Sequence, residues 1–161
     1  MSNLTVDLNS QLIADSKKSL IKLLVFKIGK LTLSLPILQV QKVIKHNPIH
    51  GSGLSHVNLT HLGNRDVAIV DLHHKLFNVS LAEASQAQGY FIISKNITGE
   101  PLGILVSEPP ALIDVSPAQI RLIPESYRHA DTLKIASHVT VISQEDGSSQ
   151  TIFLLDLGSL I

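Results

Sequence analysis

A short pattern that occurs twice constrains the fold of this chain more than any other feature. Four apolar residues, an aspartate and a leucine occupy 67–72, and the same arrangement returns at 152–157, 85 positions later. Recurrence at a long spacing predicts two copies of one structural unit, with any functional surface between them. Each copy would have roughly 65–75 residues, which is small for an independent core, so we expect the two copies to share one.

Two further pairs of segments support the duplication. Leu24–Lys27 has a counterpart in Tyr90–Ile93 at an offset of 66, and Leu33–Ile37 has a counterpart in Leu102–Val106 at an offset of 69. The offsets between corresponding segments differ only by amounts that loops of different length would produce. This predicts the same order of elements in both halves.

Composition excludes several classes of protein. The chain of 161 residues has no cysteine, which excludes disulfides and thiolate metal sites and favours a cytoplasmic location. Its 13 basic residues balance 13 acidic ones, so no net charge attracts nucleic acid, and its apolar runs are too short for direct insertion into a membrane. Hydrophobic residues make up 44% of the chain and charged residues only 16%, which is typical of a large aliphatic core or of a protein that works by docking.

Apolar alternation and frequent turn residues predict an all-β protein with one or two short helices, built as small barrels. Gly29-Lys30 suits a two-residue hairpin turn, whereas the stretch from His46 to His61, with a proline and two glycines, is interpreted as a loop. Capping boxes predict helical turns after Ser80 and Ser116. The clearest expected strands lie at 67–72, 90–94, 102–106, 139–143 and 151–155.

Taken in order, these segments resemble the CheW family of bacterial chemotaxis adaptors. The residues that carry the resemblance are Leu24–Gly29, Leu35–Ile44, Ala68–Leu72, Leu102–Val106 and Phe153–Leu157. The resemblance implies two intertwined five-stranded SH3-like barrels within residues 19–161, with lobes at about 29–80 and about 90–150 that exchange strands at their ends. Residues 1–18 would form a flexible tail or one docking helix.

The same resemblance implies a non-enzymatic adaptor without cofactors. Its partners would be the regulatory domain of a CheA-type histidine kinase and the cytoplasmic tip of a methyl-accepting chemoreceptor. An inter-lobe groove and the turn before the middle strand would supply the contacts. The partner-binding candidates are Ile37, Val40, Lys42, Val43, Asn64, Arg65, Leu105, Ser107 and Leu112. For Ile37, Val40 and Val43 a place in the core is an equal alternative, whereas the charge of Lys42 must reach solvent.

The chain departs from the family pattern at the turn before the middle strand. Family members usually have Asn-Leu-Arg-Gly there and a proline in the strand; here Gly63 stands at the arginine position and Ala68 at the proline position. Arg65, two positions on, is a candidate replacement, and Ser107 stands where an aspartate usually follows a later strand. These changes leave open a second interpretation, a CheW-like decoy or regulator in a type IV pilus, twitching or phototaxis pathway.

The alternative from another class is a small β-barrel hydrolase or metal-binding protein that uses Asp71 and Asp156 or the loop from His46 to His61. Asp71 and Asp156 could form a pair of acid–base carboxylates, but each follows an apolar strand, where an aspartate commonly caps the next turn. His46 and His50 have the spacing of zinc ligands on a helix, although Pro48 between them argues against one. The usual catalytic and phosphate-binding motifs do not occur in the sequence, so we assign no catalytic, cofactor or metal site.

Overall fold

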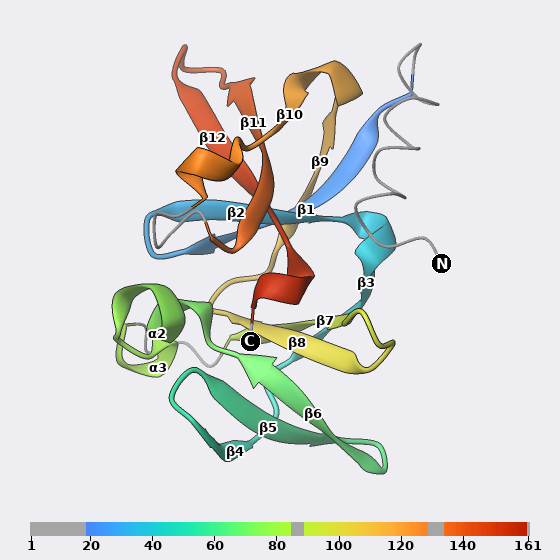
Figure 1. Ribbon diagram of the computed structural model, residues 1–161, viewed down its shortest axis with the longest axis vertical. Coiled ribbons are helices and arrows are strands. Elements are labelled where there is room, and N and C mark those ends of the chain that lie inside the picture. Colours follow the sequence, from blue (N-terminus) through green and yellow to red (C-terminus); the bar gives the residue numbers. More distant parts are fainter. Residues whose placement is uncertain (1–18, 85–88, 129–133, 161) are drawn as a thin grey trace.

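The structure, a computed structural model, describes residues 19–84, 89–128 and 134–160, so the predicted tail at 1–18 lies outside the described residues. Two six-stranded sheets lie one above the other along the long axis of the molecule (Figure 1). The strands are β1 (Ile21–Ile28), β2 (Leu31–Pro36), β3 (Val40–Lys45), β4 (Ile49–Leu54), β5 (Val57–Leu62), β6 (Arg65–Val70), β7 (Tyr90–Lys95), β8 (Pro101–Val106), β9 (Ala111–Val115), β10 (Ile120–Leu122), β11 (Ala136–Ser143) and β12 (Ser149–Leu155).

Short helical elements connect or end the strands. The α-helices are α2 (Leu72–Phe77) and α3 (Leu81–Ala84), and the 3-10 turns are η1 (Ile37–Gln39), η2 (Pro117–Gln119), η3 (Glu125–Tyr127) and η4 (Leu157–Ser159). The turns predicted from capping boxes are confirmed, because Ser80 Oγ accepts the Glu83 N–H and the Ser116 capping box is present in full. Helix α2 was not predicted, and it ends the middle strand at Val70.

Each sheet combines strands from both halves of the chain. Sheet A has the order β10-β11-β12-β2-β1-β9, and sheet B has the order β3-β7-β8-β6-β5-β4. The hairpin β1–β2 comes from the first half of the chain but lies in sheet A, whose other strands come from the second half. The hairpin β7–β8 comes from the second half but lies in sheet B, whose other strands come from the first half. This exchange confirms the predicted intertwined all-β architecture.

The parallel strand pairs confirm two of the repeat offsets. Phe153 lies opposite Leu33 where β12 meets β2, and Ala68 lies opposite Leu102 where β6 meets β8. The two pairs occupy equivalent places, which reproduces the offset of 85 between β6 and β12 and the offset of 69 between β2 and β8.

The offset between the first strands of the halves was predicted wrongly. Phe26 pairs with Leu33 in the first hairpin, and Ser94 pairs with Leu102 in the second, so β1 and β7 are offset by 68 rather than 66. A shift of two residues keeps every side chain on the same face of a strand. The hydrophobic pattern is therefore the same for both alignments, and only the pairing distinguishes them.

Two further expectations need correction. The stretch from His46 to His61 is not a loop, because it contains the paired strands β4 and β5. Its first strand is a glycine-containing, mostly exposed sheet edge without apolar alternation, so the hydrophobic pattern did not predict it.

Each sheet also has six strands rather than five. In sheet A this is because η2 divides one strand segment into β9 and β10, which lie on opposite edges.

The largest hydrophobic cluster lies between the sheets and belongs to both. Leu35 of β2 and Ile104 of β8 are fully buried in it, and Leu160 closes it from the C-terminal segment. Smaller clusters fill the inside of each sheet, one around Leu23 and one around Phe91. We call the first cluster the shared core; the expectation that the two copies share a core is thereby met.

Candidate functional site

Two exposed apolar edges border the shared core. Val43 of β3 lies opposite Ile92, and Leu112 of β9 lies opposite Leu24; both of these partners belong to the shared core. Residues paired across a strand lie on the same face, so the Val43 and Leu112 side chains are on the faces turned toward the other sheet. They nevertheless remain 39% and 53% exposed because β3 and β9 are edge strands.

The two edges are equivalent under the internal repeat. Val43 and Leu112 are 69 positions apart, which is the offset of the structurally equivalent strands β2 and β8. The segment from β2 through η1 to β3 passes from sheet A to sheet B, and the segment from β8 to β9 passes back (Figure 1). The site therefore consists of two matching apolar edges on the two crossover segments.

Turn η1 presents one residue that the sequence analysis missed. Ile37 and Val40 are half-buried and pack against the shared core, so each is partly a core residue and partly accessible. Leu38, between them, is 78% exposed, the largest value for a large hydrophobic side chain among the described residues. A 3-10 turn points successive side chains about 120° apart, which turns Leu38 away when its neighbours face inward. The Ser94 hydroxyl anchors this turn by donating to the Gln39 carbonyl oxygen.

The remaining candidates do not all reach these edges. Lys42 is exposed but lies opposite Ile93, on the other face from Val43, after a bulge in β3. Ser107 is partly exposed at the start of the crossover to β9. Leu105 is 5% exposed and packs in the cluster inside sheet B, so its side chain is a core residue and is not available to a partner.

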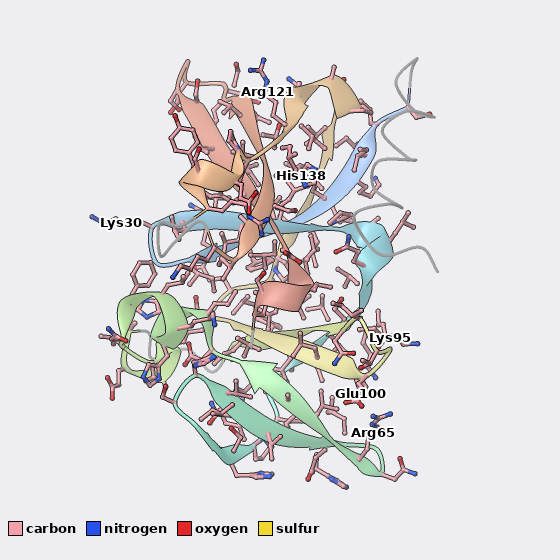
Figure 2. The ribbon with its side chains drawn as sticks, viewed as in Figure 1. Lys30, Arg65, Lys95, Glu100, Arg121 and His138 are labelled. Atoms are coloured by element: carbon pink, nitrogen blue, oxygen red, sulfur yellow. The ribbon has the colours of Figure 1, made fainter. Side chains whose placement is uncertain are left out.

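The turn that departs from the family pattern lies elsewhere, between β5 and β6. Leu62 pairs with Arg65, so Gly63 and Asn64 form a two-residue turn in which Gly63 has a φ of +64°. Arginine at that position would be strained, because only glycine adopts such a φ readily. Figure 2 shows Arg65 toward the far end of sheet B, on the same side of the molecule as Lys95 and Glu100. Arg65 and Asn64 are exposed there, apart from the shared core.

Asp71 and Asp156 are N-caps of the elements that follow the repeated pattern. Asp71 is 4% exposed and accepts hydrogen bonds from the backbone N–H groups of His74 at 3.0 Å and Leu81 at 2.9 Å. Asp156 accepts from the Gly158 N–H at 3.2 Å and from the Arg128 guanidinium at 3.2 Å. Both carboxylates are used in holding turns together, which favours the structural interpretation over an acid–base pair.

Replacing Asp71 with asparagine separates these interpretations. Asparagine keeps one of the two acceptor oxygens, so one buried N–H loses its partner and the charge-assisted bonds weaken. We expect the free energy of unfolding to fall by about 1–3 kcal/mol. Urea unfolding followed by circular dichroism measures it, with Asp156→Asn, at a more exposed cap, as the milder comparison. An unchanged stability would contradict the capping role.

The histidines of the first half do not gather into a metal site. His46 packs its ring against Phe91 at 5.1 Å between centroids, and His61 contacts Asp66 at 3.2 Å across the β5–β6 hairpin. His50 is exposed on the edge strand β4. Within the described residues, no three His, Cys, Asp or Glu side chains are placed to hold one metal ion.

His138, in the second half, is the titratable group that the sequence did not single out. It is 3% exposed on β11 (Figure 2), and its Nδ1 lies 2.8 Å from the Ser137 hydroxyl. Burial lowers the pKa of His138 below its ordinary value, the Arg128 guanidinium lowers it further, and Asp156 opposes both. The neutral imidazole is therefore the form that the fold favours.

The His138 environment predicts a loss of stability in acid. Because the pKa is lower in the folded state, the unfolded state binds more protons, and the contribution of this residue is lost as the pH falls below about 6.5. His138→Gln should reduce the slope of stability against pH between about pH 7 and pH 5. Urea midpoints measured across this range, with pH 8 as the reference, test it. An identical slope in both proteins would contradict the argument. His56, whose pKa is also lowered by burial, contributes to the slope of stability against pH in both proteins.

Exposed apolar edges of this kind are typical of proteins that act by contact with other proteins. Residues 22–161 match the family model of the CheW-like domain, and the chain belongs to this family. Membership of this family supports the role of an adaptor in chemotaxis-type signal transduction. No helix among the described residues is long and apolar enough to cross a membrane.

Comparison with solved structures agrees with this fold. The crystal structure of the scaffolding protein TtCheW from Thermoanaerobacter tengcongensis superposes with a TM-score of 0.70. The match covers 88% of this chain and 87% of that chain at 17% sequence identity. No curated protein sequence matches the chain.

Proposed function

We propose that this protein couples a CheA-type histidine kinase, through the regulatory domain of the kinase, to the cytoplasmic tip of a methyl-accepting chemoreceptor. The protein would act in the cytoplasm, where both of these partners present the relevant domains. The observation that carries the proposal is the pair of equivalent apolar edges at Val43 and Leu112, which border the shared core and yet remain exposed.

Physical chemistry supports docking at these edges. Val43, Leu112 and Leu38 expose apolar surface that a partner could remove from water, at a gain of roughly 25 cal/mol per Å². Edge strands also have unpaired backbone groups that a partner could pair with. No titratable group is needed for such a role, which fits the structural use of Asp71 and Asp156, the aspartates of the repeated pattern.

Affinity for the kinase tests the proposal. The purified protein is titrated against the regulatory domain of each CheA-type kinase from its own genome, and then against the receptor tip. We expect micromolar binding to one kinase, and Leu112→Asp or Val40→Asp should weaken binding of at least one partner about tenfold or more. Leu54→Asp is the matched control, because Leu54 is 54% exposed, like Leu112, but lies on β4.

The outcomes are distinct. Binding that Leu112→Asp weakens and Leu54→Asp does not would support docking at the apolar edges. Absence of binding to every kinase would overturn the adaptor proposal and leave the fold. Lys42→Glu, on the opposite face from Val43, reports whether that face also contacts a partner.

A decoy or regulator is a second candidate, and the turn at Gly63 favours it. The arginine that the family uses there for coupling is replaced by a glycine whose left-handed φ suits no arginine. In this case the protein would bind the kinase with ordinary affinity, but the complex of the two would not bind the receptor tip. A ternary complex of normal stability would exclude the decoy.

A further inference from the structure

The internal repeat allows the outer faces of the two sheets to be compared position by position. Val141 lies opposite Thr151 in the β11–β12 hairpin, and His61 lies opposite Asp66 in the equivalent β5–β6 hairpin. Thr151 and Asp66 differ by the repeat offset of 85, so Val141 occupies in sheet A the place that His61 occupies in sheet B. The same register makes Arg121, opposite Val139, the counterpart of His50, opposite Leu59.

The two equivalent faces have different chemistry. In sheet B the His61 ring and the Asp66 carboxylate form a cross-strand pair at 3.2 Å, as expected of a solvated face. In sheet A the same place holds Val141, which is 52% exposed. Since both halves meet the same backbone constraints, the exposed Val141 is not required by the fold, whereas Val139 has an apolar counterpart in Leu59.

A groove of about 400 Å³ lies over this apolar face. Its lining consists of Ala118, Gln119, Arg121, Val139 and Val141. Beside it, β10 is a three-residue edge strand, and its last residue, Leu122, is 66% exposed. An exposed apolar patch with a polar rim is typical of a site of protein interaction.

The charge of the groove indicates what it can bind. Arg121 is the one charged residue in the lining, and it forms no ion pair with any residue that the structure describes. Figure 2 shows it at the end of sheet A that is farthest from sheet B, well away from the shared core. A carboxylate is therefore the group that best complements the groove.

The spacing of the aliphatic residues indicates the shape of the partner. Val139 and Val141 lie on the same face of β11, about 6.8 Å apart, which is the separation of alternate residues in an extended chain. We propose that this groove binds an extended segment of a partner protein that places an acidic side chain on Arg121 and two aliphatic side chains on Val139 and Val141. The proposal does not rest on the proposed function, because it concerns a different surface.

Two matched peptides test the proposal on the full chain. One has the sequence Thr-Glu-Thr-Val-Thr-Val-Thr, which puts the glutamate and both valines on one face, and the other replaces the glutamate by lysine. Amide chemical shifts in NMR titrations locate the contact and give the affinity. We expect the acidic peptide to bind at least about tenfold more tightly, with shifts at Arg121, Val139 and Val141.

Charge reversal makes the test specific. Arg121→Glu should reverse the preference so that the lysine peptide binds more tightly, and Val141→Asp should weaken both peptides. His50→Glu, at the equivalent place in sheet B, is the matched control and should change neither affinity. The urea midpoint of each variant confirms that it is folded. Equal binding of the two peptides, contact at Val43 and Leu112 instead, or no binding below about 1 mM would overturn the proposal. So would occupation of the groove by a second copy, seen as a concentration-dependent dimer that Val141→Asp abolishes.

Discussion

Leu35→Ala should lower the free energy of unfolding by about 3 kcal/mol, in one transition that both sheets share. Leu35 of β2 in sheet A is fully buried in the shared core, which also contains Ile104 of β8 in sheet B. Removing three carbons from this position loses transfer free energy and leaves a cavity between the sheets. Because each sheet also contains a hairpin from the other half, neither can unfold while the other stays intact.

Urea unfolding measures the loss of stability, and hydrogen exchange measures whether both sheets share it. Amides of sheet B, such as those of β8, should lose as much protection from Leu35→Ala as amides of sheet A, although the substitution is in sheet A. Leu122→Ala is the matched control; its side chain is 66% exposed and the change should cost less than about 0.5 kcal/mol. Two separate unfolding transitions, or a loss of protection confined to sheet A, would show that the sheets are independent.

Gly89→Ala should destabilise the protein by about 3 kcal/mol or more. Gly89 has a φ of +88°, and a methyl group added to it would lie 2.2 Å from the backbone oxygen of Val106. A backbone oxygen cannot rotate away as a side chain does, so β7 or β8 must shift at the start of their pairing. The hydrogen bond from the His46 N–H to the Gly89 carbonyl, at 3.2 Å, would be disturbed as well.

Gly63→Ala separates the clash from the backbone strain. Gly63 also has a positive φ, +64°, but nothing lies within 4 Å of an added methyl group. This variant should therefore cost only about 1 kcal/mol, the usual penalty of the left-handed conformation. The difference between the two variants, measured by urea unfolding, is the cost of the close approach at Val106. Equal losses would mean that the strands relax freely at that point.

Much of the fold could be predicted from the residues because duplication and capping are local signals. The repeated pattern that contains Asp71 and Asp156 correctly predicted two equivalent units, each with an aspartate cap after a buried strand. The capping box at Ser116 predicted its 3-10 turn for the same reason: the groups that satisfy each other lie within a few residues. Such interactions depend little on the rest of the chain.

The candidate site depended on the tertiary structure to a greater degree. Leu105 and Leu112 are both leucines in strand-like sequence, yet the first is buried inside sheet B and the second is exposed at an edge of sheet A. A strand's own residues determine which side chains share a face, but its neighbours determine whether that face is covered. Those neighbours are distant in the sequence here, since each sheet takes one hairpin from the other half.

The sequence by itself thus determined the repeat, the aspartate caps and the all-β class, because period-two alternation and capping are short-range properties. Only the tertiary structure decided the true offset of β1 and β7, the strand status of the exposed edge β4, and which apolar residues remain at the surface. The physical reason is that a shift of two residues, an uncovered edge and an exchanged hairpin all leave the local hydrophobic pattern unchanged. They differ only in which backbone groups pair with one another and in which strands cover each face.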